Sequence, residues 1–189
     1  MNFLDRYKIE NEKMLSIFTQ KQKRILALMC LERQFHTYRK FVDGKIWDRS
    51  EQYRELLDKC WTIVLSDSDA DDGIWYFHEK IRSDNLCNKE DCTLGLWIAN
   101  IFASHIEEWL DYLIDEPIYE EAFRLLTLDF ILVYLNEEDD EESFKYDTYE
   151  NHPLIAKEMK QQIQDETDMT IIHNLEDVKK WYCQCKGIF

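Results

Sequence analysis

Glycine and proline are scarce in this sequence, with four Gly and two Pro among 189 residues. β-Sheets and their tight turns need residues that adopt positive φ or hold φ fixed, which are the properties of glycine and proline. The scarcity therefore favours helices joined by polar loops. With 45% hydrophobic and 14% aromatic residues, the chain still has ample material for a packed core, which argues against disorder.

Apolar residues recur at three- and four-residue spacing in several segments, which is the pattern of amphipathic helices. Gly44 is expected to end the second of these helices, and Ser50 is a suitable N-cap for the third. The spacing predicts helices over residues 3–18, 20–42, 50–65, 74–81, 94–114, 117–134, 153–163 and 174–185.

These segments predict an all-α fold, a single compact bundle of about six to eight helices. We expect one domain over residues 1–189, with its core at about 20–165 and a C-terminal extension at 168–189. The segment 94–114 is apolar on most of its faces, so we expect it in the centre of the bundle. Residues 169–173 are expected to form a short extended piece, in at most one minor strand pair.

The N-terminus carries charged residues at Asp5 and Arg6, where a signal peptide needs an apolar run. No stretch of the sequence approaches the ~20 apolar residues of a membrane span. We therefore expect a cytoplasmic protein, in which cysteines are reduced thiols and several pack in the core. The cysteines are Cys30, Cys60, Cys87, Cys92, Cys183 and Cys185.

The net charge of −16 is unevenly distributed along the chain. Residues 1–60 contain 13 Lys/Arg and 9 Asp/Glu, whereas residues 61–189 contain 10 Lys/Arg and 30 Asp/Glu. Between residues 105 and 150 there are 16 acidic and 2 basic residues. Such a surface repels nucleic acid and anionic lipid and attracts a basic partner. A solvated acidic surface that serves solubility alone would give the same pattern.

Two groups of residues resemble metal sites in composition but fail in spacing. The Asp-rich segment 67–73 could begin a calcium loop at Asp67 or at Ser68. The first start supplies the ligands and the second supplies the turn glycine, but neither supplies both. Cys87 and Cys92 are five residues apart and Cys183 and Cys185 two apart, whereas zinc usually needs two well-spaced pairs. We therefore predict no metal ion and no cofactor.

No catalytic motif is present: the sequence has no glycine-rich phosphate loop, no nucleophile elbow and no HExxH pattern. His105 lies in the apolar segment 94–114 with Glu108 three residues later, so a general base oriented by a carboxylate is one interpretation. A buried histidine with satisfied hydrogen bonds is the other. We expect a protein that is not an enzyme, and an enzyme that uses His105 remains an alternative.

The most distinctive feature is a run of six consecutive acidic residues. Blocks of like charge stay extended and solvated, and they often serve as interaction segments. Tyrosines follow the run, and tyrosine is an efficient interface residue. A solvated loop and a binding surface both explain the run. The residues predicted to contact a partner are Glu137, Glu138, Asp139, Asp140, Glu141, Glu142, Tyr146 and Tyr149, with Asp111, Asp115, Glu116 and Tyr119 as an extension.

Several segments resemble the YjaG-like family, small bacterial helical proteins of unknown function. The resemblance covers roughly residues 20–165 and implies an all-helical fold, with no implication for catalysis. The residues that carry it are Cys30-Leu31-Glu32-Arg33 with Tyr38 and Phe41, Tyr53-Arg54-x-Leu56-Leu57-Asp58 with Trp61, the segment 96–110, and Glu150-Asn151-x-Pro153 with Glu158.

As a class, the chain is also similar to the immunity proteins of bacterial toxin systems, including those of contact-dependent growth inhibition. That similarity implies a small, acidic, cytoplasmic protein that covers the active site of a basic nuclease. Our hypothesis is therefore an immunity protein whose partner is a cognate toxin, a basic nuclease domain, with no direct binding of nucleic acid or membrane. A housekeeping helical protein whose acidity serves solubility is the alternative.

Overall fold

A computed structural model describes residues 3–46, 48–66, 72–83, 93–114, 126–128, 130–132, 135, 151–171 and 177–179. The described residues form helices and their connections, and none of them lies in a strand. The all-α prediction is therefore confirmed. No helix in this part of the chain is long and apolar enough to span a membrane.

The described helices begin at or near the predicted positions, but α7 runs past its predicted end at residue 163 to Ile171. Residues 126–128, 130–132, 135 and 177–179 are also helical. The labelled helices are α1 (Phe3–Leu15), α2 (Gln20–Val42), α3 (Ser50–Ser66), α4 (Asp72–Ser83), α5 (Leu94–Ile114) and α7 (Pro153–Ile171).

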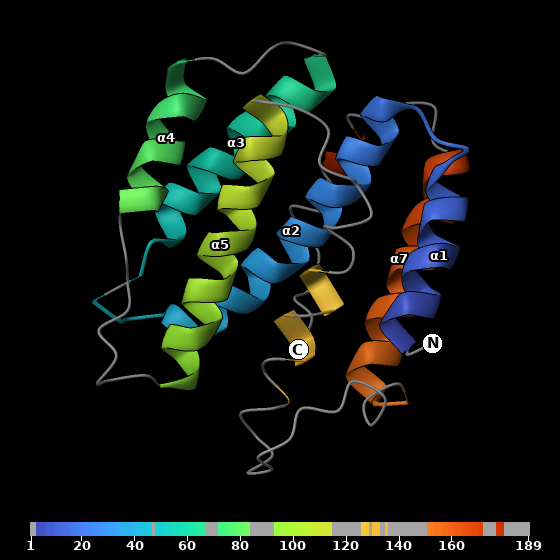
Figure 1. Ribbon diagram of the computed structural model, residues 1–189. Helices are drawn as coiled ribbons and strands as arrows, with labels where there is room; N and C mark the ends of the chain where they lie inside the picture. Colours follow the sequence, from blue (N-terminus) through green and yellow to red (C-terminus); the bar gives the residue numbers. More distant parts are fainter. Residues whose placement is uncertain are drawn as a thin grey trace.

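The helices are arranged around α2 (Figure 1). α1 and α7 lie side by side on one flank of α2, whereas α3, α4 and α5 lie on the other. α2 contacts α3, α5 and α7, and α4 packs between α3 and α5. One hydrophobic core joins residues from all six helices.

Local chemistry explains where α2 begins and ends. Thr19 caps its N-terminus, since its hydroxyl accepts the backbone N–H of Gln22 while the Gln22 side chain accepts the Thr19 N–H. Gly44 follows the helix with φ 71°, a left-handed conformation that glycine adopts without strain. At the start of α3, Asp48 supplies the capping carboxylate, because its Oδ1 accepts the Ser50 N–H at 2.8 Å. Ser50, the predicted cap, is instead the first helical residue.

The prediction that residues 94–114 form the central helix is wrong. The central helix is α2, although its sequence carries more charge than that of α5. α5 borders α2 and α4 and leaves Trp97 42% exposed. Charged and polar residues of α2 are nevertheless buried, because partners on neighbouring helices satisfy them, and hydropathy does not register such pairing.

The extended piece predicted at residues 169–173 is also wrong where the structure describes it. α7 continues as a helix through Ile171, and residues 172–173 lie outside the described part. Met169 continues the buried stripe of α7 and is 1% exposed. The hydroxyls of Thr167 and Thr170 donate to carbonyls of the preceding turn, at 3.0 and 2.7 Å, so these threonines are compatible with the helix.

Candidate functional site

A buried ion-pair network joins α1, α2 and α7. Arg33 donates to both oxygens of Glu158, with its closest contact at 2.6 Å, and to Asp165 at 2.8 Å. Burial alone would lower the pKa of Arg33, but the charges of Glu158 and Asp165 raise it well above its ordinary value. Gln162 donates to Glu158 at 2.9 Å and accepts from the Tyr7 hydroxyl. These residues are all buried, so the network is part of the scaffold.

A second network joins α2 to α3. Glu32 is fully buried and accepts from both terminal nitrogens of Arg54 at 2.7 Å and from the Trp61 indole N–H at 2.7 Å. Arg54 also forms an ion pair with Asp58. The Asp58 Oδ1 lies 3.7 Å from the Nζ of Lys179, in the C-terminal helical segment 177–179. Satisfied acceptors and donors of this kind hold helices in register.

His105, the predicted alternative catalytic residue, is a buried residue of the scaffold. Gln34 Nε2 donates to Thr127 Oγ1 at 2.8 Å, so Gln34 Oε1 faces His105 and accepts from its Nδ1 at 2.7 Å. The ring of Phe130 lies 6.3 Å away, and His105 is 3% exposed. Burial lowers the pKa of His105 to about 3, so the ring is neutral at physiological pH.

The cysteines in the described part behave as predicted. Cys30 and Cys60 are buried free thiols. Burial raises the pKa of Cys60 to about 12, so this thiol is a poor nucleophile at neutral pH. Cys87, Cys92, Cys183 and Cys185 lie outside the described residues, as does the Asp-rich loop at 67–71. Among the residues that the structure does describe, no group of three or more candidate ligands is placed to hold a metal ion.

Asp111 is the one predicted partner-contact residue within the described part, and it links α5 to α4. Its Oδ1 lies 2.7 Å from Nε2 of His78, which is 4% exposed. This separation is a close contact rather than an aligned hydrogen bond, since His78 Nε2 has no partner at hydrogen-bonding angles. The Trp75 ring packs edge-on against the same imidazole, with centroids 6.2 Å apart. His78 thus supports a tryptophan and a carboxylate that both reach solvent.

Exposed aromatic residues concentrate on α4 and α5. The large aromatic side chains that reach solvent among the described residues are Trp75 (44% exposed), Tyr76 (62%) and Trp97 (42%). α5 contributes three carboxylates and has no lysine or arginine. Trp97 and Glu108 are separated by eleven residues, three helical turns, and therefore share one side of α5. We call the exposed residues Trp75, Tyr76, Glu79, Trp97 and Glu108, together with the half-buried Asp111, the α4–α5 face.

The remaining predicted contact residues cannot be placed on this face. The acidic run 137–142 lies outside the described residues, with Tyr146 and Tyr149. The same is true of Asp115, Glu116 and Tyr119, which follow α5 in the sequence. Their role as partner contacts stays a prediction.

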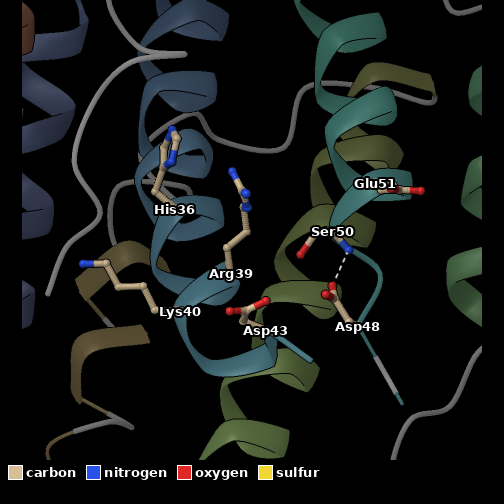
Figure 2. Close-up of a pocket in the computed structure, with 7 residues that line it drawn as sticks. All are labelled: His36, Arg39, Lys40, Asp43, Asp48, Ser50 and Glu51. Carbon is tan, nitrogen blue, oxygen red and sulfur yellow. Dashed lines mark hydrogen bonds between the residues drawn. The ribbon is translucent and has the colours of Figure 1, made fainter. Parts of the chain in front are cut away.

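A polar cleft of 620 Å³ lies between the end of α2 and the start of α3 (Figure 2). Three potentially cationic side chains come from α2, and three carboxylates and a hydroxyl come from the α2–α3 connection and the first turn of α3. The lining residues are His36, Arg39, Lys40, Asp43, Asp48, Ser50 and Glu51.

Sequence reasoning missed both the α4–α5 face and the cleft, although signals for each were present. In α4, Ile74, Phe77 and Ile81 recur at the spacing of a buried stripe, which places the neighbouring Trp75 and Tyr76 outside it. In α2, His36, Arg39 and Lys40 stand at i, i+3 and i+4 and therefore share a side of the helix. Neither group matches a known motif, so a search for motifs passes over both.

Comparison with known proteins supports the fold. A solved structure of a DUF416 family protein from Shewanella baltica superposes with a TM-score of 0.75, covering 90% of this chain and 92% of that chain at 16% identity. At this identity the similarity concerns the arrangement of helices alone and gives no information about activity. No family model and no curated protein matches the sequence.

Proposed function

We propose that this chain is a cytoplasmic, non-enzymatic binding protein of the immunity type, which neutralises a basic toxin domain by covering its cleft. The partner that we infer is a nuclease, because a cleft that holds phosphates is lined by positive charge. The observation that carries the proposal is the α4–α5 face, where carboxylates and exposed aromatic rings lie on two packed helices.

The aromatic and the acidic side chains on this face contribute to binding in different ways. Trp and Tyr are enriched among the residues that contribute most to binding energy, since they bury large area with few rotamers to fix. The carboxylates Glu108 and Asp111 steer a basic partner toward the face and favour it over neutral or acidic proteins. Trp75 needs little reorganisation on binding, because His78 already supports its ring.

The surroundings of His105 argue against general-base catalysis by that residue. A general base has to reach the proton that it removes. His105 is 3% exposed, and its Nδ1 is held by Gln34. The remaining alternative, a housekeeping protein whose acidity serves solubility, predicts no basic partner at all.

Affinity purification from the native host tests the proposal directly. We expect a basic protein with nuclease activity to co-elute, and the purified chain to inhibit that activity stoichiometrically. The association rate should fall as ionic strength rises, because the Debye length is about 8 Å at physiological salt. A chain that captures no basic partner, or that leaves the captured partner fully active, would contradict the proposal.

Substitutions on the face locate the contact. Replacing Glu79 and Glu108 by Lys should slow association and weaken binding at least tenfold, because like charges then meet across the interface. Trp75→Ala should act mainly on the dissociation rate by removing an anchor. The matched control replaces Glu10 and Glu12, exposed on α1, by Lys, with the same change in net charge. Equal weakening by both pairs would show that only net charge matters.

The acidic run is tested separately. Replacing Glu138, Asp139, Asp140 and Glu141 by Lys should weaken binding and reduce its salt dependence while the melting temperature stays unchanged, since a solvated charge run contributes little to stability. If affinity and salt dependence do not change, the run is a solvated loop and the α4–α5 face alone carries the proposal.

A further inference from the structure

The cleft between α2 and α3 separates opposite charges onto its two sides. His36, Arg39 and Lys40 line it from α2, whereas Asp48 and Glu51 line it from the start of α3, with Asp43 between them in the chain. A ligand that carried only negative charge would meet three carboxylates. A ligand that carried only positive charge would meet the arginine and the lysine. The cleft therefore matches a ligand that carries both charges.

Arg39 supplies the clearest binding group. Its guanidinium projects from α2 into the space between α2 and α3 (Figure 2). Among the described residues its partner is the ring of Phe35, with the guanidinium 5.9 Å from the ring centroid, and no carboxylate lies within ion-pair distance. Asp43 stands four residues later, just past the end of α2, and makes no ion pair with Arg39. The arginine fork is thus available for a carboxylate, which it binds in bidentate fashion.

The acidic side of the cleft is held in place before any ligand arrives. Asp48 accepts the Ser50 N–H at 2.8 Å, and the Arg49 N–H donates to the buried Tyr38 hydroxyl at 2.9 Å. Within the connection, the Lys45 N–H donates to the Val42 carbonyl at 2.9 Å, and the Asp48 N–H donates to the Lys45 carbonyl at 3.1 Å. A preformed site loses less entropy when it binds, so a small ligand can gain useful affinity there.

We propose that this cleft binds a small zwitterion, a free amino acid or a short peptide with free ends. The ligand carboxylate pairs with Arg39, beside His36, and the ligand ammonium lies toward Asp43 and Asp48. The volume of 620 Å³ falls within the ~300–1,000 Å³ of small-molecule sites, and a lining made of charged and polar residues suits a hydrophilic ligand. This site is independent of the proposed toxin partner and of the α4–α5 face.

Nuclear magnetic resonance of the full chain tests the proposal, with the Arg39 side-chain Nε–H as the reporter. The probes are glycylglycine, glycine, acetate and methylammonium, titrated at constant ionic strength. We expect glycylglycine or glycine to shift the Arg39 resonance saturably, with a dissociation constant roughly in the millimolar range for two exposed charge-assisted contacts. Acetate and methylammonium, which each carry half of the charge pattern, should produce no saturable shift.

Variants assign the two ends of the ligand. Arg39→Gln should abolish binding, followed through the backbone amides of residues 48–51, and Asp43→Asn should weaken it at least fivefold. Arg6→Gln on α1 is the matched control and should leave binding unchanged. Acetate binding as tightly as glycylglycine would overturn the proposal in favour of a simple anion site. The absence of any saturable shift would overturn it in favour of an Arg39–Asp43 pair that closes in solution.

Discussion

His105 makes the stability of this fold depend on pH in a way that a single substitution tests. Burial lowers the pKa of His105 from 6.5 to about 3. Between these values the unfolded chain takes up a proton that the folded chain excludes. The contribution of His105 to stability is therefore fully present above pH 6.5 and is lost progressively as the pH falls toward 3.

The size of the effect follows from the distance between the working pH and the pKa of the unfolded chain. Each pH unit below about 6.5 costs about 1.4 kcal/mol, so at about pH 5 the folded state loses about 2 kcal/mol. Domains of this kind are stable by about 5–15 kcal/mol, so the loss is readily measured.

Urea unfolding at about pH 7.5 and about pH 5 provides the assay, with the wild-type chain compared to His105→Asn. Asparagine keeps a donor for Gln34 and does not titrate. Other groups titrate equally in both proteins, so the wild-type chain should lose about 2 kcal/mol more than the variant over this range. Ile106→Val, one residue along α5, is the control and should lower stability by about 0.5–1.5 kcal/mol at both pH values.

An equal loss of stability in the wild-type chain and in His105→Asn would refute the reasoning. It would mean that His105 takes up its proton inside the fold at an ordinary pKa. The assignment of a neutral, buried ring that donates to Gln34 would then be wrong.

Substitutions at three further positions test the scaffold. Arg33→Met should lower the free energy of unfolding by about 3–5 kcal/mol, because Glu158 and Asp165 stay buried without their cation; an unchanged urea midpoint would contradict the network. Asn11→Leu should raise the melting temperature, since the Asn11 amide is 3% exposed and has no hydrogen-bond partner among the described residues; a lower melting temperature would indicate bound water there. Gly44→Ala should cost about 1 kcal/mol, from backbone strain at φ 71° alone, because an added Cβ meets no atom within 4 Å. Gly44→Asn should cost less in the same unfolding assay, and equal stability of all three proteins would rule out the strain.

The helices were predictable because apolar periodicity is a local property. The segment 94–114 was predicted with the bounds that α5 has, and Pro153 was predicted at the start of α7. The identity of the central helix was not predictable, because it depends on which polar side chains find partners far away in the sequence. Glu32 illustrates this: it reads as a surface residue until Arg54 and Trp61 are seen around it.

The candidate site was predictable only in part. Asp111 was predicted from charge to contact a partner, which stays a prediction, and the structure adds that its carboxylate contacts His78. The exposure of Trp75 and Trp97 was missed, because aromatic residues are normally assigned to the core and their side of the helix is known only once its neighbours are. Sequence charge thus shows where acidic residues are dense, whereas only packing shows which side chains of a helix reach solvent.

Three consecutive residues at the centre of α2 point to three different neighbours. Glu32 reaches α3, Arg33 reaches α7, and Gln34 reaches His105 on α5. Successive residues of a helix are 100° apart around its axis. The three contacts therefore form together at only one rotation of α2 about its axis and one position along that axis. Sliding α2 by one residue would unpair all three contacts at once and leave buried charge behind. The triplet thus contributes to the specificity of the fold. It adds little to the net free energy of folding, but it makes every other alignment of the helices costly.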